Sequence, residues 1–201
     1  MAAPDTPETP LLCDELLVGL TGSPAVLAMP QYLLLLRQGM VGTVRVMMSR
    51  GAQRFLPPYT VRLFASNWVH TDNHEVHDGY LVPHIELTQT ADLLLVMPAT
   101  ANAIAKAANG ICDDLISTAI VACNAPVVLV PAMNGTMWTS RAVQRNVERA
   151  RDLGYHVIDP GEGLGLSDLE PGTGLMPPLE HILTDLVDLV SAHRHAAAVA
   201  T

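Results

Sequence analysis

The chain has 201 residues, of which 49% are hydrophobic and 15% charged, and its 11 basic and 20 acidic side chains give a formal charge of −9. This length favours one domain, the apolar content excludes intrinsic disorder, and no apolar run is long enough for a transmembrane helix. The acidic charge argues against nucleic acid or an anionic membrane as a partner, and the scarcity of charges indicates surface buried against another subunit.

Apolar runs and breaks predict the order of the elements. Residues 1–14 are expected to form a flexible N-terminal tail ahead of one domain at 15–195. Short apolar runs predict strands at residues 16–20, 43–48, 92–97, 125–131 and 155–158. Longer segments predict helices at residues 25–38, 85–90, 99–109, 113–123, 139–153 and 179–192. The Gly- and Pro-rich segment 159–178 lacks apolar periodicity, and we expect a lid or binding loop there.

Strands and helices alternate along the chain, and the runs at 92–97 (DLLLVM) and 125–131 (APVVLVP) are apolar apart from Asp92 at the start of the first. Such strands are buried on both faces, so the pattern predicts an α/β fold in which helices cover both sides of a parallel sheet. Ligands of such sheets bind outside the carboxyl ends of the strands. We therefore expect the functional residues to follow the predicted strand ends at Leu20, Met48, Met97 and Val130.

Small turns with hydroxyl groups follow the first two strands. Backbone N–H groups and hydroxyls in the turn at 21–24 (TGSP) can bind a phosphate, and Ser49 in the turn at 49–51 (SRG) is a second candidate phosphate ligand. Neither turn has the GxGxxG or Walker pattern that indicates a dinucleotide or a nucleoside triphosphate. An ordinary strand-to-helix turn explains each of them equally well.

The next two strand ends combine small residues with amides. Residues 98–102 (PATAN) allow a flat ring to lie against the backbone, where Thr100 and Asn102 can bond its heteroatoms. Capping of the following helix by Thr100 is the alternative. Residues 131–138 (PAMNGTMW) place the amide of Asn134 at the sheet edge. Three apolar side chains can form a wall around a ligand there, although such residues serve cores and interfaces more often: Met133, Met137 and Trp138.

The histidines and cysteines carry little signal by themselves. Taken by itself, His84 is best explained as an ordinary surface histidine or a hydrogen-bonded core histidine. A polar stretch has ligand-type side chains but lacks rigid elements for zinc, so we expect no metal site at His70, Asp72, His74, Glu75, His77 and Asp78. Cys13, Cys112 and Cys123 have no CxxC spacing and suit reduced thiols in a cytoplasm. Cys112 and Cys123 are expected to be buried small hydrophobes.

Three motifs and one histidine together match a known family. Residues 98–102 are similar to a PA(S/T)AN flavin loop, residues 108–113 (ANGICD) to an ANGxxD segment, and residues 131–138 to the signature PxMNxxMW. His84, in the sequence PHIE, matches an active-site histidine. On these residues the chain resembles the homo-oligomeric flavin-containing cysteine decarboxylases. That family includes lantibiotic peptidyl-cysteine decarboxylases of the epidermin and mersacidin types and phosphopantothenoylcysteine decarboxylase.

The resemblance implies a flavodoxin-like subunit that binds FMN, or FAD in some members, near a subunit interface. The implied homo-oligomer is a trimer or a dodecamer built from trimers. The flavin ligands that it implies are Gly22, Ser23, Pro24, Ser49, Pro98, Ala99, Thr100 and Asn102. In the implied reaction, the flavin would accept two electrons from the Cβ–S unit of a C-terminal cysteine. The thioaldehyde so formed is an electron sink, so carbon dioxide leaves and an enethiol remains.

The resemblance also implies roles for individual residues. His84 would be the base for the thiol proton, because imidazole exchanges protons near neutral pH. Asn134 would hold the carboxylate without an ion pair that stabilises it against loss of carbon dioxide. Met137, Trp138 and the lid at 159–178 would contact the peptide.

The lid distinguishes two members of the family. Phosphopantothenoylcysteine decarboxylases carry a cysteine in it, and residues 159–178 contain none. We therefore expect a peptidyl-cysteine decarboxylase acting on a ribosomally made, lantibiotic-type precursor, whose enethiol forms an aminovinyl-cysteine ring. Phosphopantothenoylcysteine decarboxylase in coenzyme A synthesis is the first alternative. A non-catalytic flavin-binding regulatory subunit is the second, which the presence of both His84 and Asn134 disfavours.

Overall fold

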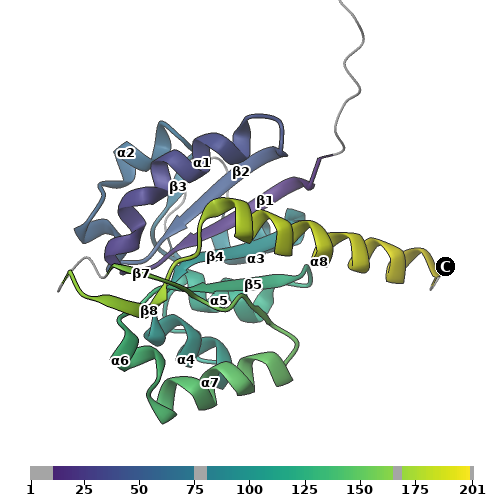
Figure 1. Ribbon diagram of the computed structural model, residues 1–201. Coiled ribbons are helices and arrows are strands. Elements are labelled where there is room, and N and C mark those ends of the chain that lie inside the picture. Colours follow the sequence, from purple (N-terminus) through teal and green to yellow (C-terminus); the bar gives the residue numbers. More distant parts are fainter. Residues whose placement is uncertain (1–10, 75–80, 165–168, 200–201) are drawn as a thin grey trace, which may run out of the picture.

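A six-stranded parallel sheet runs through the computed structural model, which describes residues 11–74, 81–164 and 169–199 (Figure 1). Its strands are β1 (Cys13–Leu20), β2 (Val41–Met48), β3 (Val69–His70), β4 (Leu93–Ala99), β5 (Val127–Pro131) and β6 (His156–Val157). They lie in the order β3-β2-β1-β4-β5-β6, and all neighbours are parallel. Without the two-residue edge strand β3, this is the strand order of flavodoxin, so the predicted fold class is confirmed.

Helices cover both faces of the sheet (Figure 1). One face packs against the 3-10 helix η1 (Pro24–Ala28), α1 (Met29–Arg37), the 3-10 helix η2 (Ala52–Arg54), α2 (Pro58–Arg62) and α8 (Leu179–Val199). The other face packs against α3 (Pro83–Thr90), α4 (Ala101–Asn109), α5 (Leu115–Ala122) and α7 (Arg141–Asp152). Side chains alternate between the two cores along a strand. Leu16 and Val18 of β1 therefore face α1 and α8, whereas Leu17 faces α5.

The first strand begins inside the segment predicted to be a tail. Cys13 is 2% exposed and pairs with Val41 of β2. The carboxylate of Asp92 accepts hydrogen bonds from the backbone N–H groups of Asp14 at 3.1 Å and Glu15 at 2.8 Å. These contacts order the chain from Cys13 onward, so the predicted tail ends too late at residue 14. Residues 1–10 lie outside the described part.

Two predicted helices have different limits in the structure. The segment 25–38 forms η1 followed by α1, because Pro30 lies in the first turn of α1 and cannot continue a preceding helix. The last helix, α8, extends to Val199 instead of ending at 192. Among the residues that the structure describes, no helix has both the length and the apolar character required to cross a membrane.

The segment predicted as a lid contains a β-hairpin. Strands β7 (Gly161–Leu164) and β8 (Pro171–Leu175) pair antiparallel, while residues 165–168 lie outside the described ranges. The two strands are rich in glycine and proline and lack an alternation of apolar and polar side chains. The sequence therefore predicts no strand there. Backbone hydrogen bonds form the pair, and those require no particular side chain. Figure 1 shows the hairpin beside α6 (Gly135–Trp138).

Candidate functional site

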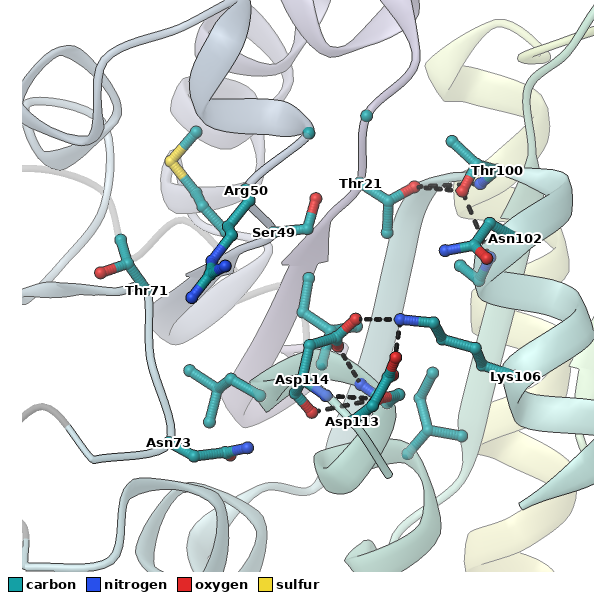
Figure 2. Close-up of a pocket in the computed structure, with 18 of the residues that line it drawn as sticks. Thr21, Ser49, Arg50, Thr71, Asn73, Thr100, Asn102, Lys106, Asp113 and Asp114 are labelled. Carbon is teal, nitrogen blue, oxygen red and sulfur yellow. Dashed lines mark hydrogen bonds and ion pairs between the residues drawn. The ribbon is translucent and has the colours of Figure 1, made fainter. Parts of the chain in front are cut away.

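A cavity of about 810 Å³ lies at the carboxyl ends of β1, β2, β3 and β4, the edge of the sheet that the sequence predicts for a ligand (Figure 2). The turns after these strands line it with Thr21, Gly22, residues 49–51, residues 71–74 and residues 100–103. Lys106 of α4, Met137 of α6, residues 113–117 and Ile120 complete the walls. The strand order reverses at β1, because β2 lies on one side of it and β4 on the other. Ligands of open α/β sheets bind at such a switch point.

Two threonines join the turns on either side of the switch point. The hydroxyl of Thr21, which is 4% exposed, donates to the carbonyl of Pro98 at 2.7 Å and accepts from the N–H of Thr100 at 3.0 Å. Thr100 Oγ1 accepts from the N–H of Ala103 at 3.2 Å and caps α4. Thr100 thus caps the helix, as the alternative interpretation of 98–102 predicts, and also lines the cavity.

The turns after β1 and β2 touch through their backbones. A Cβ atom on Gly22 would lie 2.9 Å from Gly51 Cα, so only glycine allows this approach. Ser49 N donates to the carbonyl of Leu20 at 3.0 Å, and Ser49 Oγ accepts from the N–H of Ala52 at 3.2 Å. The hydroxyl proton of Ser49 remains available to a ligand. Together the two turns form a rigid cradle at one end of the cavity.

Lys106 and two aspartates form the opposite wall. Lys106 Nζ lies 2.6 Å from a carboxylate oxygen of Asp113 and 2.6 Å from one of Asp114. Burial lowers the pKa of Lys106, but the two carboxylates outweigh it and leave that pKa raised. Asp114 also caps α5 through the N–H of Ser117 at 2.8 Å. Burial raises the pKa of Asp114, yet the hydrogen bonds from Lys106 and Ser117 leave it lowered.

Asn134 is exposed at the end of β5, where it caps the short helix α6. Its Oδ1 accepts a hydrogen bond from the N–H of Met137 at 2.8 Å, which leaves Nδ2 to donate outward. The hairpin docks on this segment, since the N–H of Met133 donates to the carbonyl of Gly174 at 2.8 Å. Met137 lines the cavity, so the hairpin, Asn134 and the cavity are adjacent.

His84 stands in the first turn of α3 and does not line the cavity. Its Nδ1 is buried and has no partner among the described residues. The same holds for Glu86 Oε2, although Glu86 Oε1 accepts the N–H groups of Leu81 at 3.0 Å and Val82 at 3.3 Å. Leu81, Val82 and Ile85 expose apolar surface around these atoms. Buried polar atoms usually have a hydrogen-bond partner. The unpaired atoms and exposed apolar side chains at the beginning of α3 are therefore typical of a surface that binds another chain.

The structure brings only some of the predicted ligands to the cavity: Gly22, Ser49, Thr100, Asn102 and Met137. Four other predicted ligands do not line the cavity. Ser23 caps η1 and Pro24 is the first residue of η1, while Pro98 and Ala99 belong to β4. Asn134 and Trp138 lie on the segment under the hairpin, beside the cavity. Several polar residues that line the cavity are not marked as ligands by the sequence, among them Arg50, Asn73, Lys106, Asp113 and Asp114.

The cysteines are free, and they differ in exposure. Cys112 is exposed, so its predicted burial is wrong; the left-handed Gly110 (φ 65°) ends α4, and Cys112 follows in the loop. Burial, with a smaller effect of Asp92, raises the pKa of Cys13 to about 12, and burial also raises the pKa of the half-buried Cys123. In residues 11–74, 81–164 and 169–199, no three His, Cys, Asp or Glu side chains group to hold a metal ion. The predicted polar loop residues Glu75, His77 and Asp78 lie outside these ranges.

Comparison with known proteins gives matches over most of the chain. Mersacidin decarboxylase of Bacillus sp. (strain HIL-Y85/54728) is 32% identical over 170 residues, which are 85% of this chain and 84% of that protein. The coenzyme A biosynthesis bifunctional protein CoaBC of Bacillus subtilis (strain 168) is 42% identical over 120 residues, 60% of this chain but only 30% of that longer protein.

A solved structure and a family model agree with these matches. The crystal structure of the FMN-dependent cysteine decarboxylase SpaF superposes with a TM-score of 0.75 at 31% identity, covering 89% of this chain and 97% of that one. A family model described as Flavoprotein matches residues 6–191. On a match of this extent, the chain belongs to the Flavoprotein family.

Proposed function

We propose that the protein catalyses the flavin-dependent oxidative decarboxylation of the C-terminal cysteine of a ribosomally made, lantibiotic-type precursor peptide, giving an enethiol for aminovinyl-cysteine formation. One observation carries the proposal. The oxygen of the Asn134 amide is occupied by the N–H of Met137, which leaves its Nδ2 donor for a ligand, on a segment that carries both Met137 of the cavity wall and the docked hairpin. A carboxylate donor, a cofactor cavity and a peptide clasp therefore adjoin one another.

The residues around the cavity fit FMN. The contact between Gly22 and Gly51 brings backbone close to a ligand, and the Ser49 hydroxyl can donate to a phosphate. Thr100 and Asn102 supply hydrogen-bonding groups for a flavin ring, with Met137 as apolar wall. When bound, FMN would supply the acceptor for the two electrons that leave the cysteine Cβ–S unit. The similarity to the FMN-dependent cysteine decarboxylase SpaF supports FMN over FAD.

Asn134 orients the substrate carboxylate. Because Oδ1 is occupied by the N–H of Met137, Nδ2 can donate to a carboxylate oxygen. A neutral donor holds the carboxylate without a full opposite charge, so binding does not oppose the loss of carbon dioxide. Electrons released by that loss pass into the thioaldehyde carbon and sulfur, which leaves the enethiol.

His84 takes the thiol proton, and a second copy of the chain brings it to the reaction. His84 does not line the cavity of its own chain, and the partnerless atoms of His84 and Glu86 lie among exposed apolar side chains. A homo-oligomer that buries the start of α3 against a neighbouring cavity would complete both sites. This arrangement accounts for the apolar and charge-poor composition. The free thiols fit the reducing conditions of a cytoplasm.

Phosphopantothenoylcysteine decarboxylation remains the second candidate, because CoaBC of Bacillus subtilis shares 42% identity over 120 residues. Against it stands the lid, which has no cysteine at 159–178. The docked hairpin β7–β8 provides backbone edges against which an extended peptide can lie.

Incubation of the purified protein with synthetic peptides ending in cysteine tests the proposal. Mass spectrometry should show loss of carbon dioxide and two hydrogens from the peptide. Matched peptides ending in serine or in cysteine amide should stay intact, because they lack the thiol or the free carboxylate. Turnover of phosphopantothenoylcysteine alone would support the second candidate, and a flavin-bound protein inert toward both substrates would indicate a regulatory subunit.

A further inference from the structure

Among the described residues that line the cavity, Arg50 is a cation that makes no ion pair. It follows β2 directly, and Figure 2 shows its side chain reaching into the cavity on the side opposite Lys106. The positive charge of Lys106 is already bonded to Asp113 and Asp114 at 2.6 Å each. Within the described residues, Arg50 has no hydrogen bond or ion pair. Asp72, in the loop after β3, also lines the cavity, but no ion pair joins it to Arg50. Arg50 therefore offers an unpaired positive charge, whereas the charge of Lys106 is neutralised.

The charges decide where an anion can bind. Asp113 and Asp114 leave one excess carboxylate at the Lys106 wall, which repels a phosphate. The surroundings of Arg50 instead offer free backbone donors. The N–H groups of Gly22, Arg50 and Gly51 have no acceptor within the described part of the chain. Successive N–H groups of this kind bind anions. An arginine guanidinium can add two parallel hydrogen bonds to a phosphate.

We propose that Arg50 is the residue that makes the cavity selective for a phosphorylated flavin, by pairing with the terminal phosphate monoester of FMN. The inference rests on the proposed flavin function and adds the residue that sets the ligand's orientation. Ser49, Arg50 and Gly51 would hold the phosphate. Thr100 and Met137 would then be left to contact the flavin ring.

Flavin binding measured by quenching of flavin fluorescence tests this role without any turnover. The full chain, freed of flavin, is titrated with FMN and with riboflavin, which lacks the phosphate. Arg50→Met should weaken FMN binding about 10- to 100-fold, the range expected for a lost hydrogen-bonded charge pair. Riboflavin affinity should change less than about twofold, since the other ring and ribityl contacts remain. Arg50→Lys should lie between the two, because lysine keeps the charge but not the planar fork.

The chain offers a matched control four residues away. Arg54 lies in η2 and does not line the cavity, so Arg54→Met should bind both flavins like the natural chain. Unchanged FMN affinity in Arg50→Met would overturn the inference, and would leave Arg50 free for a substrate phosphate instead. Equal weakening of FMN and riboflavin would also overturn it, because the effect would then be structural. Failure of the natural chain to bind either flavin would overturn the proposed function itself.

Discussion

Thr21 and Thr100, which are 79 residues apart in the sequence, hold the two sides of the switch point together. The hydroxyl of Thr21 accepts the N–H of Thr100 at 3.0 Å while donating its own proton to Pro98 at 2.7 Å. Thr21 is 4% exposed, so its bond to Pro98 is shielded from water and its bond from Thr100 is partly shielded. The position of the Thr100 turn relative to β1 is thus fixed before any ligand binds.

Thr21→Val should destabilise the fold and weaken flavin binding. Valine has the shape of threonine but leaves the N–H of Thr100 without its partner, and the carbonyl of Pro98 keeps only the longer bond from the backbone N–H of residue 21 at 3.3 Å. We expect the free energy of unfolding in urea to fall by about 1–3 kcal/mol. Thr21→Ser keeps the hydroxyl and should recover most of that loss. Equal stability of the valine and serine variants would show that the hydroxyl contributes nothing.

The Lys106 cluster should make stability depend on pH. Burial raises the pKa of Asp114, but the hydrogen bonds from Lys106 and Ser117 outweigh it, so the folded state favours the ionised form. This stabilisation is present above the pKa of an unfolded aspartate, about 4, and is lost as pH falls through the lower folded pKa. The gap in unfolding free energy between the natural chain and Asp114→Asn should therefore be widest near neutral pH and close at acidic pH.

Urea unfolding at a series of pH values checks this dependence. Asparagine can still cap α5, so the variant removes the charge and keeps the cap. Asp113→Asn is the matched comparison, because Asp113 also bonds Lys106 but its side chain is 59% exposed against 38% for Asp114. Its effect should be smaller. A gap for Asp114→Asn that does not vary with pH would contradict the assignment.

The sheet was predictable from the sequence because its strands are buried on both faces. The run at 93–97 is apolar at every position, which predicts a strand at the sheet centre, and the small and polar residues from Pro98 onward indicate the ligand edge. The hairpin β7–β8 was not predictable as strands, since backbone pairing among glycines leaves no pattern of side chains. β3 was not predictable either, because two residues are too few to show an alternation of apolar and polar side chains.

Site residues were predictable where they lie in a turn directly after a strand. They were not predictable where tertiary packing brings a distant residue to the cavity. Ser49 and Thr100 were recognised from their position after a strand. Lys106 looks like an ordinary helix-surface lysine in sequence, and only the return of the chain at Asp113 and Asp114 places it in the cavity wall. His84 shows the opposite case. Its sequence context marks it, yet a single copy of the chain leaves it outside the cavity.

Gly174→Ala should detach the hairpin from the Asn134 segment. Gly174 has φ 91°, and a Cβ atom there would lie 2.7 Å from the carbonyl oxygen of Met133 and 3.0 Å from Trp138 Cβ. We expect a loss of about 1–3 kcal/mol in the free energy of unfolding and a higher KM for the peptide. Gly172→Ala, in the same strand, has open space at its Cβ position and should behave like the natural chain. Equal KM values for the two variants would exclude a role for hairpin docking in peptide binding.

His84→Asn should keep the yellow flavin-bound protein and abolish decarboxylation. The side chain does not line the cavity of its own chain, so its loss should not alter flavin affinity. Removal of a general base should lower kcat by about 100-fold or more. Mixing His84→Asn with Asn134→Asp should give more activity at low peptide concentration than either variant alone if the two residues act from different copies of the chain. Full turnover by His84→Asn alone would remove this histidine from the mechanism.

Asn134→Asp separates the capping role of this residue from its role toward the substrate. Aspartate is isosteric and can still accept the N–H of Met137, so α6 and the melting temperature should be preserved. It replaces the outward donor by an anion, which repels the peptide carboxylate, and KM should rise about 10-fold or more. Asn134→Ser keeps a cap without the charge and should have a smaller effect. Because repulsion disappears when aspartate is protonated, the defect of Asn134→Asp should lessen at acidic pH relative to that of the serine variant; equal defects across the pH range would refute the role.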